Sequence, residues 1–93
     1  MPAQITKQLA LKIAKKLRAT KDATRSRAHD LMVVEHNGRE VVSFGIRRGS
    51  RREAGHDHIP GDLRVPMHFA KLLAQCPRSR QDYIDLLIQQ GHI

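Results

Sequence analysis

The stretch from residue 28 to residue 50, AHDLMVVEHNGREVVSFGIRRGS, decides the fold, because it predicts a β-hairpin that leads directly into an arginine cluster. Two runs rich in β-branched residues flank Asn37-Gly38. A two-residue type I′ turn needs positive φ at both central residues, which Asn and Gly adopt most readily. The cluster follows the second run, at Arg47, Arg48, Arg51 and Arg52. The stretch therefore predicts a small sheet that presents guanidinium groups at one end.

Strand pairing follows by counting outward from the turn, since a two-residue loop fixes the register. The expected pairs are His36 with Arg39, Val34 with Val41, and Leu31 with Phe44. The face expected to pack on helices then carries Leu31, Val33, Val42, Phe44 and Ile46. Glu35 and Glu40 should oppose each other near the turn, where like charges require that this end of the hairpin projects into water.

Helical and polar segments surround the hairpin. Apolar side chains recur every four residues between about residues 4 and 18, which predicts an amphipathic helix with a basic outer face. Residues 19–28 show no apolar periodicity and predict an exposed loop. The alternation in residues 55–60 (GHDHIP) predicts a short third strand that ends at Pro60-Gly61.

Two further helices are expected after this strand. One opens at Pro66, since proline is favoured at the first helical position, and runs to about Gln75. The other follows Pro77, with Ser79 and Asp82 spaced as a capping-box-like pair and with Gly91 after its end. The predicted fold is an α+β single domain over residues 1–93, with a three-stranded antiparallel sheet, helices packed on one face and the order α-β-β-β-α-α.

Charge is the strongest compositional signal: the 93 residues carry a formal net charge of +8. A strongly basic small domain favours nucleic acid as its partner. Aromatic residues make up only 3% of the chain, which disfavours a base-stacking surface, whereas duplex RNA is recognised through shape and phosphates. The candidate contact residues are Lys15, Lys16, Arg18, Arg25, Arg27, Arg47, Arg48, Arg51 and Arg52. These charges also have explanations that involve no nucleic acid. The lysines near the end of the helix can stabilise the helix dipole, and the arginines can form a solvated loop that favours solubility.

Histidines offer two candidate sites. His29 stands at the start of the first predicted strand, opposite Ile46 and next to the arginine cluster. There an imidazole could take the proton of a ribose 2′-hydroxyl, with Arg47 or Arg48 as phosphate clamps. His56-x-His58 has a metal-ligand spacing but lacks a supporting third ligand, so we predict no metal site. The alternative for this pair is a bond to backbone at a strand edge or a contact to phosphate.

Other classes of chemistry lack a motif. The sequence contains no P-loop, G-x-G-x-x-G, G-x-S-x-G or C-x-x-C pattern, and we expect no cofactor. The lone cysteine, Cys76, allows no intramolecular disulfide and is expected in the core. No apolar run is long enough to span a bilayer, and the start of the chain lacks the features of a signal peptide, so we expect a cytoplasmic protein with no membrane partner.

The arrangement resembles the HicA-type toxins of toxin–antitoxin pairs. The resemblance covers roughly residues 5–75 and rests on the helix, the polar loop, Ala28-His29 opening a strand, the Asn-Gly hairpin, and Ile59-Pro60 before a helix. It implies a double-stranded-RNA-binding-domain-like fold, messenger-RNA cleavage and an antitoxin-like protein partner. The family's functional histidine corresponds to His29, although Arg27-Ala28 stands where the family has Gly-Ser. An arginine-rich insertion and an extra helix after Cys76 also depart from the family pattern.

The sequence thus predicts a nucleic-acid-binding protein, with RNA favoured over DNA and with His29 as the acid/base residue if the protein is a ribonuclease. The alternative is a non-catalytic module that binds DNA or a protein. The last helix can pack on its own sheet or on a second copy, so the sequence leaves a homodimer open.

Overall fold

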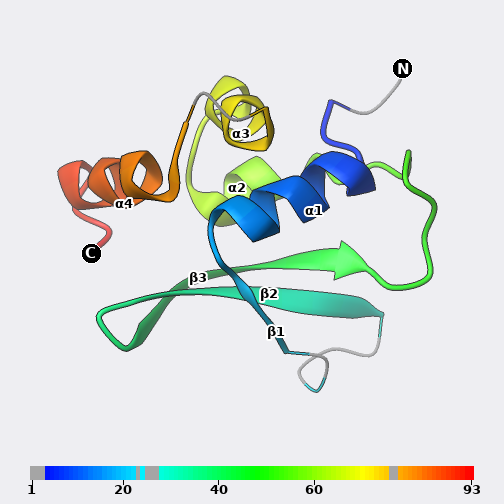
Figure 1. The fold of residues 1–93 in the computed structure, drawn as a ribbon, viewed down its shortest axis with the longest axis horizontal. Helices are drawn as coiled ribbons and strands as arrows, with labels where there is room; N and C mark the ends of the chain where they lie inside the picture. Colours follow the sequence, from blue (N-terminus) through cyan, green and yellow to red (C-terminus); the bar gives the residue numbers. More distant parts are fainter. Residues whose placement is uncertain (1–3, 23, 25–27, 76–77) are drawn as a thin grey trace.

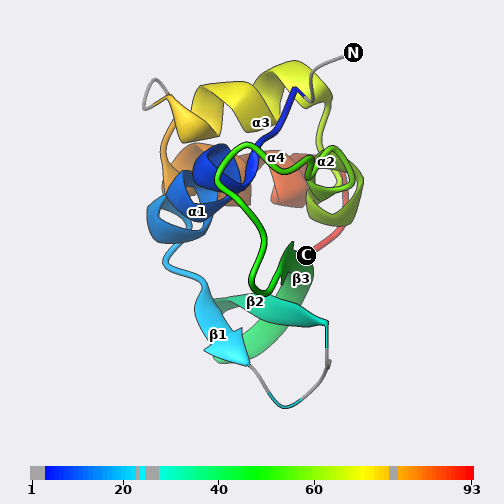
Figure 2. The same ribbon diagram turned by 90° about the vertical axis from the view of Figure 1, so that its right-hand side faces the viewer.

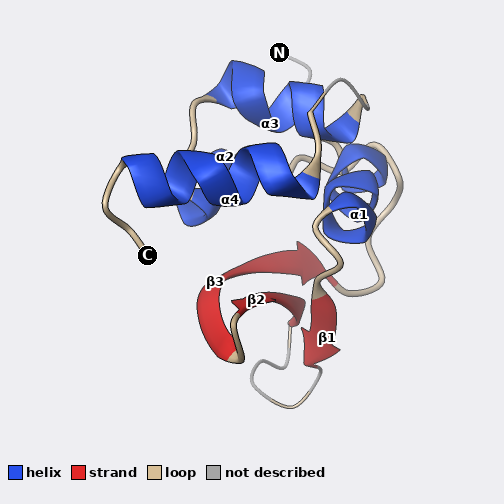
Figure 3. Ribbon diagram, turned by 60° about the vertical axis from the view of Figure 1, so that its left-hand side comes forward, coloured by secondary structure: helices blue, strands red, loops and turns tan. Residues whose placement is uncertain are grey.

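The structure is a computed structural model, and it describes residues 4–22, 24, 28–75 and 78–93. Three antiparallel strands form one sheet, and the helices lie on one face of it (Figures 1 and 3), which confirms the predicted α+β class. The elements are, in order, α1 (Lys7–Lys16), β1 (Thr20–Asp22), β2 (His29–His36), β3 (Arg39–Arg47), α2 (Ile59–Leu63), α3 (Met67–Ala74) and α4 (Arg80–Gln89).

The hairpin of β2 and β3 turns at Asn37-Gly38, as predicted. Both residues have positive φ, 54° and 77°, which the type I′ turn requires. The pairs His36–Arg39 and Glu35–Glu40 are also confirmed. Beyond them the predicted register is wrong, because an irregularity between Val34 and Glu35 inserts one extra residue, Val41, into β3.

The bulge changes which side of β2 faces the helices. The observed pairs are Val34–Val42, Met32–Phe44, Leu31–Gly45 and His29–Arg47. Val42, Phe44 and Ile46 are buried in the core as predicted, but the side chains that join them from β2 are Val34 and Met32. The prediction that Leu31 and Val33 belong to the core face is therefore wrong. By the alternation of a strand they lie on the face without helices.

The third strand is not the predicted one. Thr20, Lys21 and Asp22 form β1, which pairs with Val33, Met32 and Leu31 of β2, so the expectation of an exposed loop over residues 19–28 is wrong at its start. Edge strands need only backbone hydrogen bonds, and this polar triplet has no apolar alternation that could predict one. The strand order is β1-β2-β3, and β3 has a free edge.

Residues 56–60 also differ from the prediction. His56 and His58 precede a short helix, α2, which contains Pro60 and Gly61 and gives the observed order α-β-β-β-α-α-α. Proline is tolerated here because it occupies the first turn, where the missing N–H has no helical partner. The arginine-rich segment therefore follows the last strand of the sheet.

The helices meet in one core against β2 and β3, built from α1, α2, α3 and α4. The predicted capping box of α4 is present: Ser79 accepts from the backbone N–H of Asp82, and Asp82 accepts from that of Ser79. The buried Tyr83 hydroxyl donates to the Leu63 carbonyl at 2.9 Å, which fixes α4 against the end of α2. Among the described residues, no helix is long and apolar enough to cross a bilayer. Cys76 lies outside the described residues.

Candidate nucleic-acid interface

His29 lies beside Arg47 at one end of the sheet. The two residues are direct cross-strand partners, so their Cβ atoms are about 5 Å apart and their side chains share the face without helices. The predicted partner of His29, Ile46, instead pairs with Asp30, because the bulge shifts β3 by one residue. The histidine is half-buried and Arg47 is exposed. The fold therefore brings the candidate base closer to a guanidinium group than the sequence predicts.

Arg48 makes contacts within the protein that the sequence does not predict. Its Nε donates to Asp30 Oδ1 at 2.9 Å, and an Nη2 donates to the His29 carbonyl at 3.3 Å. Lys21 Nζ lies 3.6 Å from the other carboxylate oxygen of Asp30. The hydrogen bond from Arg48 holds the pKa of Asp30 below its usual value; burial opposes this, and the charges of Lys21 and Arg48 add to the lowering. Arg48 thus holds the start of β2, whereas Arg47 is exposed and makes no ion pair with a described carboxylate.

The loop that follows β3 is held against the first turn of α1 (Figures 1 and 2). The backbone N–H groups of Lys7 and Gln8, which have no partner within the helix, donate to the carbonyls of Ala54 and Arg52 at 2.9 and 3.0 Å. Lys7 Nζ donates to the Ser50 carbonyl at 3.1 Å. The loop backbone is therefore fixed, while the side chains of Arg51 and Arg52 are exposed.

Further cations lie on the exposed side of α1, the helix to which this loop is hydrogen-bonded. Lys12 and Lys15 are exposed at a spacing of three residues, so they lie on one helical face, and Arg18 is exposed just after the helix. Ten helical residues span about 15 Å. We call this surface the basic band; its residues are Lys12, Lys15, Arg18, Arg51 and Arg52. Lys16, predicted as a contact, is only half exposed.

Acidic residues concentrate elsewhere. Five of them lie at the turn of the hairpin, in α2 and in α4: Glu35, Glu40, Asp62, Asp82 and Asp85. In the part of the chain that the structure describes, no carboxylate pairs with Arg47, Arg51 or Arg52. Glu53 lies in the same loop, next to Arg52, so the positive charge there is offset in part but exceeds the local negative charge.

The predicted contact residues thus divide into groups. Arg51 and Arg52 lie beside α1, which also carries Lys15 and precedes Arg18, and Arg47 lies at the end of the same loop. Arg48 binds Asp30 and the His29 carbonyl within the protein. Arg25 and Arg27 lie outside the described residues. Sequence reasoning missed Asp30 as the partner of Arg48, because the arginine loop and the start of β2 are 18 residues apart.

The His56-x-His58 pair contacts the free edge of β3, as one of the alternatives for it proposed. The backbone N–H of Arg47 donates to Nε2 of His56 at 3.0 Å, and Nε2 of His58 lies 2.8 Å from the Gly45 carbonyl. Asp57 points the other way and accepts from the backbone N–H of Ile5 at 2.6 Å. The side chains of residues 56–58 do point alternately to opposite sides. The segment is not a strand, however, and the edge of β3 is bonded by the two histidine side chains instead of by a strand backbone.

His56 is fully buried and held in one tautomer. Its Nδ1 lies 2.9 Å from the Ala54 carbonyl, which can only accept, so Nδ1 carries the hydrogen and Nε2 accepts from Arg47. Burial lowers the pKa of His56, the Ala54 bond opposes this, and the charges of His58, Arg47 and Lys7 add to the lowering. Across the described residues, no group of three or more His, Cys, Asp or Glu side chains could hold a metal ion.

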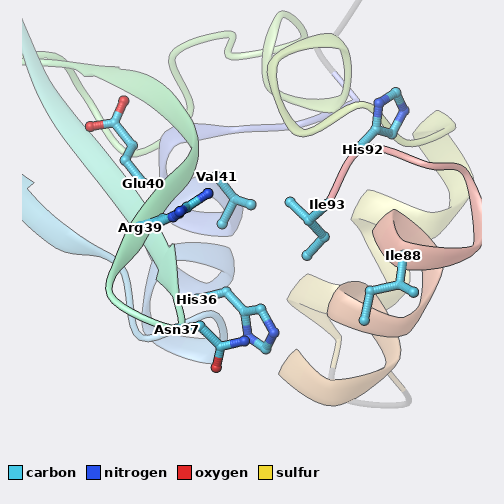
Figure 4. Close-up of a pocket in the computed structure, with 8 residues that line it drawn as sticks. All are labelled: His36, Asn37, Arg39, Glu40, Val41, Ile88, His92 and Ile93. Carbon is cyan, nitrogen blue, oxygen red and sulfur yellow. The ribbon is translucent and has the colours of Figure 1, made fainter.

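A hollow of about 710 Å³ opens at the opposite end of the hairpin (Figure 4). His36, Arg39, Ile88 and His92 line it together with Asn37, Glu40, Val41 and Ile93. His36 is seven strand residues from His29, which corresponds to about 23 Å. None of the predicted site residues lines this hollow. Lys15, Lys16 and Arg18 instead border two other hollows beside α1, of about 440 and 370 Å³.

No family model, no curated protein and no solved structure matches this chain.

Proposed function

We propose that the protein binds RNA through the basic band and Arg47, and cleaves it at His29. The observation that carries this proposal is the placement of His29 directly across from Arg47, at the start of a loop in which Arg48 pairs with Asp30 but Arg51 and Arg52 have no carboxylate partner within the described chain. A proton acceptor next to a phosphate-binding group is the arrangement that cleavage of RNA requires.

The chemistry of RNA explains the roles. The ribose 2′-hydroxyl can attack the adjacent phosphorus once a base removes its proton, and the imidazole of His29 is a suitable base near neutral pH. Arg47 can donate two parallel hydrogen bonds to the phosphate oxygens and stabilise the charge that develops on them. This route does not require a metal ion. DNA lacks the 2′-hydroxyl, so it would bind without being cleaved.

The basic band supplies affinity. Lysine and arginine side chains that neutralise phosphates release counterions, which favours binding to any nucleic acid. The band follows a rigid helix and a loop whose backbone is hydrogen-bonded to that helix, so little order has to be gained on binding. A straight, aromatic-poor cationic surface of this kind suits a duplex region better than unstacked bases.

The resemblance to HicA-type toxins supports the same activity. A helix, a sheet of three strands and a further helix follow in order, although His29 opens the second strand of the sheet, whereas the resemblance implies the first. By this resemblance we also propose a small antitoxin-like protein as a natural inhibitor. A neighbouring reading frame that encodes such a protein would support this part of the proposal.

The test compares binding with cleavage. Purified wild-type protein is incubated with labelled RNA, and the products are examined for 2′,3′-cyclic phosphate ends. His29→Ala should abolish cleavage while the Kd for RNA changes by less than about threefold, since His29 contributes no positive charge when neutral. His68→Ala, which changes an exposed histidine of α3, serves as the matched control.

Two outcomes would redirect the proposal. Tight binding of duplex RNA or DNA without cleavage by the wild type would favour a non-catalytic binding module. Absence of measurable affinity for either polymer at physiological salt would favour a protein-interaction module and overturn the proposal.

A further inference from the structure

Gly45 is the point at which two histidines converge. A Cβ atom added at Gly45 would lie 3.2–3.3 Å from three side-chain atoms of His29, so the histidine packs directly over the glycine. Nε2 of His58 lies 2.8 Å from the carbonyl oxygen of the same residue. The imidazoles of His29 and His58, far apart in the chain, thus both lie beside Gly45.

The bond to Gly45 engages Nε2 of His58 and leaves Nδ1 for a second contact. A carbonyl oxygen only accepts, so Nε2 of His58 donates to it in both the neutral and the charged ring. Nδ1 is therefore the atom that can take up or release a proton without breaking the anchoring bond. His58 is also exposed, so a substrate can reach it.

His56 lacks this capacity, although it is only two residues away and its ring centre lies 5.6 Å from that of His58. Both of its ring nitrogens are occupied, one as donor to Ala54 and one as acceptor from Arg47. A proton on Nε2 would face the Arg47 N–H and break that bond. The two histidines of the motif therefore differ: His56 is held through both ring nitrogens, and His58 is held to the sheet edge through Nε2.

We propose that His58 is the general acid that acts with His29 in RNA cleavage, an inference that rests on the proposed function. His29 takes the proton from the 2′-hydroxyl, the 2′-oxygen forms a bond to phosphorus, and the bond from phosphorus to the 5′-oxygen breaks. His58 gives its Nδ1 proton to that leaving oxygen. The products are a 2′,3′-cyclic phosphate and a 5′-hydroxyl, and water returns the two histidines to their starting protonation states.

The geometry suits a divided acid and base. The attacking and the leaving oxygen lie on opposite sides of the phosphorus in an in-line displacement, so one imidazole cannot serve both at once. His29 lies over the helix-free face of Gly45, whereas His58 contacts it at the free edge of β3. Arg47, the cross-strand partner of His29, can hold the phosphate between them.

The experiment replaces the bridging 5′-oxygen of one cleaved linkage with sulfur. A thiolate leaves without being protonated, so a variant that lacks only the general acid should recover activity on this substrate. We expect His58→Ala to cleave the oxygen substrate at least about 100-fold more slowly than wild type, and to cleave the sulfur substrate within about fivefold of it. His29→Ala should remain inactive on both, and His68→Ala should match wild type on both.

Thermal melts of each variant accompany the rates, and His58→Gln, which retains a donor for the Gly45 carbonyl, should behave like His58→Ala. Wild-type rates of His58→Ala on the oxygen substrate, or equally slow cleavage of both substrates by a folded variant, would overturn the role of His58 alone. Failure of the wild type to cleave either substrate would overturn the proposed function together with this inference.

Discussion

The His56 side chain should be a large contributor to the stability of the fold. Replacement by Ala removes the donor to Ala54 and the acceptor for Arg47, each worth about 1 kcal/mol, and it leaves a backbone N–H at a buried site without a partner, which adds about 1 kcal/mol more. His56→Ala should therefore lower the free energy of unfolding by about 3 kcal/mol. A domain of 93 residues typically has about 5–14 kcal/mol in total.

Thermal unfolding followed by circular dichroism measures this loss. At about 4–8 °C per kcal/mol, the Tm of His56→Ala should fall by about 12–24 °C. His58→Ala is the matched control: it removes one hydrogen bond at an exposed site that water can replace, so it should cost less than about 1 kcal/mol. Equal losses for the two variants would refute the assignment of His56 as the residue that secures the edge of β3.

Three further predictions follow from single contacts. Burial lowers the pKa of His56 below 6.5, so on acidification the unfolded chain binds a proton before the folded chain does. The contribution of His56 to stability should therefore be complete above pH 6.5 and decline as the pH falls toward the lowered pKa. Urea unfolding at a series of pH values should show this decline for wild type and not for His56→Gln. Gly45→Ala should slow RNA cleavage at least about tenfold with nearly unchanged RNA affinity, because the new Cβ would lie 3.2 Å from His29 and displace it; unchanged kinetics would show that the position of His29 does not matter. Ser79→Ala should lower stability by about 1 kcal/mol by removing the capping box of α4, and a chemical-denaturation midpoint equal to that of wild type would count against it.

The sequence predicts features that depend on local chemistry. The Asn-Gly turn needs only its own backbone geometry, and the capping box of α4 needs only two residues three positions apart. Both are therefore visible in the chain. The apolar residues of β3 are also found correctly, since Val42, Phe44 and Ile46 alternate.

Features that depend on pairing at a distance are not visible in this way. The bulge at Val41 follows from how β2 and β3 pack under the helices, and it reverses the predicted faces of β2 while it moves Arg47 opposite His29. The strand β1 has no apolar pattern, because it needs only the edge of β2. The alternation of His56 and His58 predicts a strand whose backbone pairs with β3. In the structure the two side chains contact β3 instead, and the sequence pattern is the same in both cases.

The dependence of RNA affinity on salt tests the central claim most directly. In a plot of log K against log salt concentration for duplex RNA, each phosphate contact contributes about one unit of slope. Lys15→Gln/Arg52→Gln, which removes two charges from the basic band, should reduce the slope by about two units, whereas Arg39→Gln/Arg64→Gln, at the other end of the molecule, should leave it within about half a unit of wild type. Equal slopes for the two double variants would contradict binding through the loop and α1.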